Sequence, residues 1–330
     1  MNAVCKFLRF QNSGLLVRWS YHTRLTEEAM TFADYLLHLY YLIDSELNSM
    51  DLPQIRSRGP APKLADSEVI TMELAGEFQR LDTDQGIYAF FLRYHRQEFP
   101  KLAEVDRTTF ARQAANLWRV KQLLHERLLA RLPLGDEVDG QPLWILDSFP
   151  VAVCRFARAK ASKLFKGQAS YGYDATARSI YFGFRVHLRI SDRGPIAALQ
   201  LTPAHTADMA VARDLAPKEG GWGIGDRAYW DPQDCQQLAK SSGFVLEAPF
   251  RKRASDPAPA RSKTLMRLRR LIETVNGQIV ERFHGKRVWA RDLWHLCSRL
   301  IRKVLSHTAA VLLNNFQGNP PLQLALLING

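Results

Sequence analysis

One stretch of the chain does most to decide its fold: Ser179-Ile180-Tyr181-Phe182-Gly183-Phe184-Arg185-Val186-His187-Leu188-Arg189-Ile190. Every second side chain between Phe182 and Leu188 is apolar, and the positions between them are small, charged or imidazole. An alternation with a period of two is typical of a β-strand that is buried on one face. The stretch therefore predicts a half-buried strand inside a sheet.

Further strands and helices are expected on both sides of this strand. An apolar strand over residues 143–153 precedes it, and another over residues 195–201 follows a tight turn at Arg193-Gly194. The pattern then predicts a helix over 206–215, a strand over 222–226, a helix over 231–240, a short strand over 244–249, a loop over 251–263 and a helix over 263–283. Three strands followed by alternating helices and strands make an α/β mixed sheet, in the order of the ribonuclease-H-like fold.

The chain before residue 133 has a different pattern. Helical spacing of apolar residues predicts helices over 27–50, from about 66 to 78, over 84–95 and over 107–132. Residues 1–26 contain four basic residues, no acidic residue and no clear period, so we expect a basic flexible extension there. An all-helical region then precedes the sheet, and a last helix is expected over 289–316.

Three acidic residues stand where chemistry is expected. Asp147 and Asp226 each end an apolar run, and Glu273 lies in a helical pattern. Carboxylate oxygens suit Mg²⁺, and a strand end holds a carboxylate firmly while leaving it open to solvent. Either aspartate alone would be interpreted as a turn residue and Glu273 as an exposed helix residue, but the three together favour a two-metal site. The competitor of Glu273 is Glu281, about 12 Å further along the helix.

The composition favours a polyanionic partner. The 330 residues include 45 Lys and Arg against 33 Asp and Glu, with a net charge of +12 and a pI near 9.7. Hydrophobic residues make up 46%, which excludes a disordered chain. The four cysteines form no Cys-x-x-Cys pair, so we expect free thiols in a reducing cytoplasm and no zinc ribbon. No apolar run reaches the ~20 residues that span a bilayer.

Two groups of basic residues lie near the predicted carboxylates. One follows Asp147 with no acidic residue before Asp174, and consists of Arg155, Arg158, Lys160, Lys163 and Lys166. The other, Arg269 and Arg270, lies within about one turn before Glu273. Basic side chains in these places would neutralise DNA phosphates, although a solvated surface loop carries similar residues.

Two histidines are expected to be structural. His187 lies within the alternating strand, and His205 is followed by Asp208. We interpret His205 as a loop organiser or a residue behind the metal ligands, and not as a ligand itself.

Five motifs in one order resemble the DDE transposases of bacterial insertion sequences. They are Leu146-Asp147-Ser148-Phe149-Pro150, Tyr181-Phe182-Gly183-Phe184-Arg185-Val186-His187-Leu188, Thr202-Pro203-Ala204-His205-Thr206-Ala207-Asp208, Gly225-Asp226-Arg227-Ala228-Tyr229 and Arg270-Leu271-Ile272-Glu273-Thr274-Val275. The resemblance covers residues 30–315 and is closest to the group numbered nine-eight-two among insertion-sequence families. Relatives with a fuller signature have a Tyr, an Arg and a Lys around the glutamate, where this chain has Met266, Arg269 and Val280.

The resemblance implies a role for each part of the chain. Asp147, Asp226 and Glu273 would be catalytic and would bind two Mg²⁺ ions, for which Mn²⁺ can substitute. Residues 27–135 would bind the terminal inverted repeats, residues 136–316 would form the ribonuclease-H-like catalytic domain with its C-terminal helix, and residues 317–330 would be a tail.

The implied activity is cleavage of transposon ends and their joining to target DNA. A homodimer or a larger assembly on DNA, in the bacterial cytoplasm at the nucleoid, is implied as well. Two alternatives stay open, a structure-specific nuclease or resolvase of the same fold and a catalytically inactive DNA-binding descendant.

Overall fold

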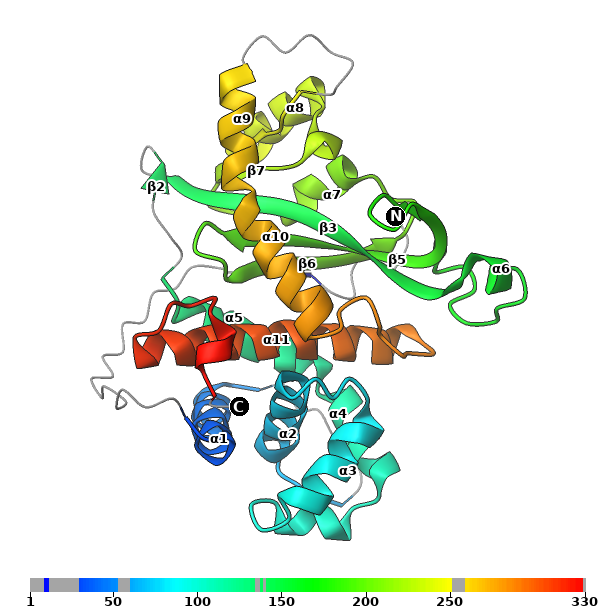
Figure 1. The fold of residues 1–330 in the computed structure, drawn as a ribbon, viewed down its shortest axis with the longest axis vertical. Coiled ribbons are helices and arrows are strands. Elements are labelled where there is room, and N and C mark those ends of the chain that lie inside the picture. The colour runs from blue at the N-terminus through cyan, green and yellow to red at the C-terminus, as the bar shows by residue number, and fades with distance from the viewer. Residues whose placement is uncertain are drawn as a thin grey trace. The chain divides into compact units, whose positions relative to one another are not determined.

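The computed structural model describes residues 9–11, 30–52, 60–133, 137–138, 141–250 and 259–328, and these form two compact units. The first unit contains the described residues of 9–11 and 132–278. The second contains those of 30–131 and 279–328. Figure 1 shows the elements of both with their labels. Within the described ranges, no helix is long and apolar enough to cross a membrane.

The first unit is built on one mixed sheet. Its strands are β1 (Arg9–Gln11), β2 (Glu137–Val138), β3 (Gln141–Arg155), β4 (Ser170–Asp174), β5 (Ser179–Ser191), β6 (Ile196–Pro203), β7 (Gly221–Ile224) and β8 (Phe244–Glu247). The hydrogen-bonded order is β1-β6-β5-β3-β7-β8, while β2 pairs with β3 and β4 with β5. Neighbours among β3, β5 and β6 are antiparallel, whereas β7 is parallel to both β3 and β8. This mixed α/β arrangement confirms the coarse fold class and is consistent with a ribonuclease-H-like fold.

Helices pack against this sheet. They are α6 (Phe156–Ala159), α7 (Asp208–Leu215), the 3₁₀ turn η3 (Arg227–Tyr229), α8 (Pro232–Ser242), α9 (Pro259–Leu268) and α10 (Arg270–Gly277). α9 and α10 follow one another almost in line and α10 crosses β3 (Figure 1), while α7 contacts β3, β5 and β6. Helices from separate parts of the chain therefore pack against β3, the strand that carries Asp147.

The strand predicted to be half buried is buried on both faces over its second half. From Val186 to Ser191 every residue of β5 is buried, including His187 and Arg189. The reason is that the polar side chains find partners there. His187 faces an aspartate of α7, and the Arg189 guanidinium lies 4.4 Å from the ring centroid of Trp144.

The second unit is helical. Its elements are α1 (Phe32–Ser49), α2 (Asp66–Phe78), α3 (Asp84–Tyr94), the 3₁₀ turn η2 (Pro100–Glu104), α4 (Arg107–Asn116), α5 (Trp118–Ala130), α11 (Leu293–Gln317) and the 3₁₀ turn η5 (Leu324–Leu326). A π-helical turn, η4 (Gln278–Arg282), joins α10 to this unit. α11 contacts α2, α4 and α5. The C-terminal helix that the sequence assigned to the catalytic region therefore belongs by its contacts to the helical unit.

Other elements also differ from the sequence prediction. The helix expected over 107–132 is two helices, because Leu117 leaves helical geometry with a ψ of 7° and its side chain is fully buried. Strand β4 and helix α6 were not predicted, and α9 begins inside the expected loop over 251–263, of which residues 251–258 lie outside the described part. In the expected extension over 1–26, Arg9–Gln11 pairs with β6.

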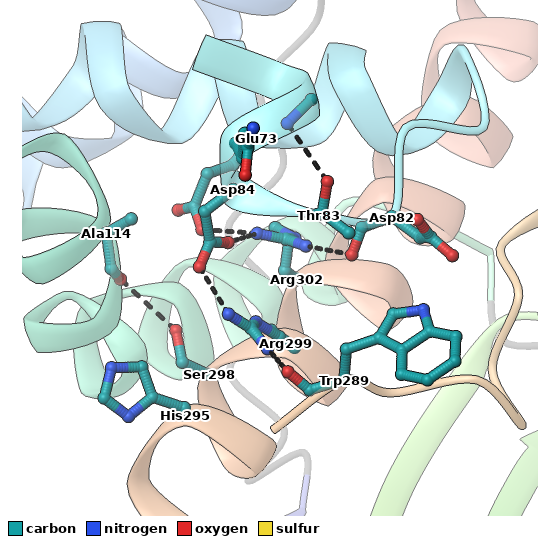
Figure 2. A network of polar contacts seen from close by, with 12 residues as sticks. Glu73, Asp82, Thr83, Asp84, Ala114, Trp289, His295, Ser298, Arg299 and Arg302 are labelled. Atoms are coloured by element: carbon teal, nitrogen blue, oxygen red, sulfur yellow. Dashed lines mark hydrogen bonds and ion pairs between the residues drawn. The ribbon is translucent and has the colours of Figure 1, made fainter. Parts of the chain in front are cut away.

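The core of the second unit contains a buried charge network. Its members are Glu73, Glu77, Asp84, Lys121, Arg302 and Lys303. Arg302 Nε lies 2.7 Å from Glu77 Oε1 and its Nη1 lies 2.7 Å from Asp84 Oδ1. Lys121 Nζ lies 2.8 Å from Glu73 Oε2. Figure 2 shows Arg302 beside Glu73 of α2 and Asp84 of α3, with Asp82 on the other side of its guanidinium. Pairing offsets much of the desolvation cost of these charges, and it joins α2, α3, α5 and α11.

Candidate active site

Two of the predicted acidic residues lie in or just after neighbouring strands. Asp147 is in β3, opposite Leu188 of β5. β7 runs parallel to β3 with Ile145 paired to Ile224, and Asp226 follows β7 by two residues. β7 ends at Ile224, beside Ile145, so Asp226 comes close to Asp147 within β3, and the charge of Asp226 acts on the Asp147 carboxyl group.

The turn after β7 fixes the position of Asp226. Gly225 donates its backbone N–H to Glu247 O at 2.8 Å, and a Cβ on Gly225 would lie 2.6 Å from the ring of Tyr229. A side chain therefore cannot be accommodated there without movement. Asp226 Oδ1 accepts a hydrogen bond of 2.7 Å from Ala228 N, which caps the turn η3 and orients the carboxylate.

Asp147 is in an environment that disfavours its charge. Burial raises the pKa of Asp147 to about 6, the Arg269 guanidinium and the Ser148 backbone oppose this rise, and the charges of Asp226 and Asp208 add to it. The Asp147 side chain keeps a fifth of its surface exposed. The site therefore combines repulsion between carboxylates with access from solvent.

One face of α10, extended back to Arg269, lies against Asp147. Asn276 Nδ2 donates a hydrogen bond of 2.9 Å to Asp147 Oδ2, and Arg269 Nη2 lies 3.7 Å from the same oxygen. Glu273 lies four residues after Arg269 and three before Asn276, so the three share one helix face. Glu273 is exposed on that face and Arg269 is buried.

The described residues contain no group of three or more His, Cys, Asp or Glu side chains placed to hold a metal ion. Glu273 therefore lies on the helix face that contacts Asp147, but its side chain does not form a three-carboxylate cluster with Asp147 and Asp226. Asn276 was not predicted as a site residue. Its Oδ1 is buried and has no hydrogen-bond partner, so it is a further oxygen that could turn to a cation. The signal that could have identified it is its position one turn after Glu273.

A polar network lies behind the aspartates. Asp208, at the start of α7, has Oδ2 2.9 Å from Arg185 Nη1 and Oδ1 3.2 Å from His187 Nδ1. His187 Nε2 lies 2.9 Å from Thr202 Oγ1. Burial favours a higher pKa for Asp208, but the hydrogen bond and charge of His187, with Ser148 and Arg185, outweigh it and lower the pKa. Asp208 therefore remains a charged anchor for β5.

The side chains of this network alternate with those that face α10. Arg185 and His187 alternate along β5 with Leu188, whose partner is Asp147. The network is thus on the other face of the sheet from Asp147. His205 joins its loop to β4, since its N–H donates to Ser170 Oγ at 2.9 Å and its Nδ1 lies 2.7 Å from the same oxygen.

Most of the predicted DNA-binding residues are at the surface. Arg158, Lys160, Lys163 and Lys166, in and after α6, are exposed, as is Arg270. Arg155 ends β3, and its side chain is outside the described part. Arg269 differs, because it is buried and faces Asp147. Its guanidinium is thus placed to balance the carboxylates more than to meet solvent.

Comparison with known proteins gives one match. Residues 138–284, somewhat less than half of the chain, match the family model described as "Transposase DDE domain". This segment contains Asp147, Asp226 and Glu273, and its match supports a transposase that acts on DNA. Neither the curated proteins nor the solved structures give a match.

Proposed function

We propose that this chain is a DDE transposase that binds the ends of an insertion sequence and catalyses metal-dependent cleavage and strand transfer. The observation that carries the proposal is that Asp147, within β3, lies next to the end of β7 that is followed by Asp226, and contacts the face of α10 that carries Glu273. The match of this segment to a DDE domain supports it. On this proposal the mixed sheet is a ribonuclease-H-like core of the nine-eight-two group.

The chemistry of the donor set fits a divalent cation. Burial first, and then the nearby charge of Asp226, raise the pKa of Asp147, and the Oδ1 atom of Asn276, whose amide contacts Asp147, has no hydrogen-bond partner. Asp147, Asp226 and Glu273 would hold Mg²⁺, or Mn²⁺ in its place. When bound, two such ions supply an activated water and stabilise the leaving oxygen of a phosphodiester.

The side chains around the aspartates have supporting roles. Asn276 holds the Asp147 carboxylate in one orientation through its 2.9 Å hydrogen bond. Arg269 balances part of the negative charge of Asp147 and would turn to the scissile phosphate when cations are bound. Gly225 and the cap on Asp226 keep the second carboxylate at the end of β7.

The exposed cations of the first unit would bind the DNA backbone. Arg158, Lys160, Lys163 and Lys166 follow the strand that carries Asp147, and contacts of this kind carry affinity without sequence preference. Recognition of the terminal inverted repeats would then fall to the helical region, residues 27–135. Because two transposon ends must be joined, we propose a homodimer or a larger assembly on DNA.

The test is an analysis of reaction products with labelled DNA. Duplexes that carry the terminal inverted repeats of the flanking DNA are incubated with the full chain, a target plasmid and Mg²⁺, Mn²⁺ or Ca²⁺. We expect nicking at the transposon end and joining to the plasmid with Mg²⁺ and Mn²⁺. Hydrolysis without joining would instead identify a nuclease or resolvase, and binding without cleavage would identify an inactive descendant.

A further inference from the structure

An exposed aromatic surface lies on the first unit, away from the aspartates. β4 pairs with the start of β5 so that Tyr171 is opposite Phe182 and Tyr173 is opposite Ile180. Side chains two apart on a strand share a face, so these four project from the same face of the ribbon. Tyr171 is 42% exposed and Tyr173 is 55% exposed. Large apolar side chains in such a row at a protein surface indicate a binding site.

The opposite face of this ribbon is closed, so the aromatic face cannot turn inward. A Cβ on Gly172 would lie 2.7 Å from the Cβ of Ala204 and 2.9 Å from the Tyr181 ring. Tyr181 itself is buried. Gly172 therefore allows β4 to lie close against the loop after β6, and the neighbouring tyrosines are held outward by the pleat.

Three of the exposed or half-buried rings, those of Phe156, Tyr171 and Phe182, contact each other in a row, and Tyr173 follows two residues after Tyr171 on the same strand face. Phe156, from α6, is 52% exposed and meets Tyr171 edge to face at 5.6 Å between ring centroids. Tyr171 meets Phe182 at 5.2 Å. We call Phe156, Tyr171, Tyr173 and Phe182 the aromatic strip. Rings held by neighbouring rings lose little freedom when a flat ligand stacks on them.

The charge around the aromatic strip selects the partner. Arg158 lies in α6 and Lys160, Lys163 and Lys166 lie between α6 and β4, all are exposed, and no acidic residue occurs between Arg155 and Tyr173. Cations alone would suffice for the backbone of a duplex, and exposed rings would add nothing to such a contact. Aromatic rings combined with cations are instead the arrangement that binds unpaired nucleotides, with phosphates on the cations and bases on the rings.

The aromatic strip and Asp147 are on the same face of the sheet. Leu188 is paired with Asp147 and Phe182 with Cys154, and six residues separate the two positions along β5, roughly 20 Å. Between them Phe165 packs on Phe184, with ring centroids 5.3 Å apart, and covers the sheet. A DNA strand with one phosphate at Asp147 would reach the strip after about six nucleotides at 3.4 Å each.

We propose that the aromatic strip stacks an unpaired base of the DNA strand that is held at Asp147 and Asp226, an inference that rests on the proposed function. The strip thereby binds DNA whose end or junction is open more tightly than fully paired DNA. Tyr171, in the centre of the row, makes the largest contribution.

The experiment measures binding and stacking without cleavage, in the presence of Ca²⁺. The probes are a thymidine 20-mer, a fully paired duplex, and the same duplex with one unpaired 2-aminopurine. Tyr171→Leu removes the ring, Tyr171→Phe keeps it, and Trp289→Leu is the control for an exposed aromatic residue elsewhere. Tyr171→Leu should weaken binding of the 20-mer and of the unpaired probe about tenfold, and binding of the duplex less than twofold.

Fluorescence gives a second readout. The wild type, Tyr171→Phe and Trp289→Leu should quench 2-aminopurine, and Tyr171→Leu should not. Equal weakening of all three probes by Tyr171→Leu would overturn the stacking role, and unchanged binding would mean that the strip receives another partner, such as a protein. If the wild-type protein joins DNA ends but does not quench 2-aminopurine, only the stacking role of the aromatic strip is refuted. If it quenches 2-aminopurine but never cuts DNA, only the proposed transposase activity is refuted.

Discussion

The negative charges of buried carboxylates are balanced by cationic side chains to very different extents in the two units. In the helical unit Glu77 and Asp84 each lie 2.7 Å from Arg302, inside a network whose charges are paired. In the sheet unit Asp147 lies 3.7 Å from Arg269, and the charge of Asp226 raises the pKa of Asp147 further after burial. A carboxylate that already has a buried cation has little to offer a ligand. A carboxylate that is open to solvent and whose charge is incompletely balanced can take a cation from outside.

The largest effect should come from removing the charge of Asp147 or Asp226. Asp147→Asn and Asp226→Asn keep the shape of the side chain but remove the charge that would bind Mg²⁺. Each should lower cleavage of terminal-repeat DNA about a thousandfold or more, while DNA binding stays near that of the wild type and the melting temperature does not fall. The double variant should be no worse than either single one, because the metals act as a unit. Cleavage by both single variants within tenfold of the wild type would disprove the site.

The role of the third carboxylate is tested by comparing two matched variants, Glu273→Gln and Glu281→Gln. Glu273 shares the helix face of Arg269 and Asn276, whose side chains both reach Asp147, whereas Glu281 lies eight residues on in η4. Glu273→Gln should lower cleavage about a hundredfold or more and weaken Mn²⁺ binding in a calorimetric titration. Glu281→Gln should change either quantity less than threefold. The reverse ranking would assign the role to Glu281.

In the helical unit the expected loss is of stability. Arg302→Met leaves three buried carboxylates without their shared guanidinium, which should cost about 3–5 kcal/mol. Urea unfolding followed by circular dichroism measures this loss. Cleavage per folded molecule at low temperature should remain, since Arg302 has no part in the proposed chemistry. Loss of cleavage with unchanged stability would mean that the network is not merely structural.

Local patterns made the sheet predictable. The alternation from Phe182 to Leu188 and the apolar runs before Asp147 and Asp226 lie within single strands, so the sequence alone indicates them. β4 depends on Gly172 fitting against Ala204, a contact that no local pattern encodes. The position of the α10 face over Asp147 likewise depends on packing, although the spacing already put Glu273 in reach.

Other features depended on partners far away in the chain. Charged residues are ordinarily expected at the surface, yet Lys121 is fully buried because Glu73 of α2 and Ser298 of α11 both bind its ammonium group. The break at Leu117 was hidden because apolar residues continue at helical spacing through it. Sequence periodicity shows which face of a helix is apolar. It does not show which charged residue from a distant part of the chain will pack against that face.

Lowering the pH should reduce the destabilising effect of the Asp147 charge in the metal-free protein. The pKa of Asp147 is raised from 3.8 to about 6 by burial first, so its charge lowers the stability of the folded protein at neutral pH. This cost diminishes as the pH falls through about 6 and is gone below the unfolded value. In EDTA, Asp147→Asn should therefore be more stable than the wild type by roughly 2–3 kcal/mol at pH 7 and by less at pH 5. Melting curves at the two pH values measure the difference. An advantage that grows toward pH 5 would contradict the raised pKa.

The smallest effect should come from an exposed ion pair in the same helical unit as the buried network. Lys63 Nζ lies 3.4 Å from Glu104 Oε2, and both side chains are more than half exposed. Glu104→Gln should change the free energy of unfolding by less than about 0.5 kcal/mol, because solvent already screens the pair and replaces it on rupture. The same measurement on Arg302→Met provides the contrast. If the exposed pair cost as much as the buried one, pairing itself would be the source of stability. The expected inequality instead assigns the effect to burial, which is also the main cause of the raised pKa of Asp147.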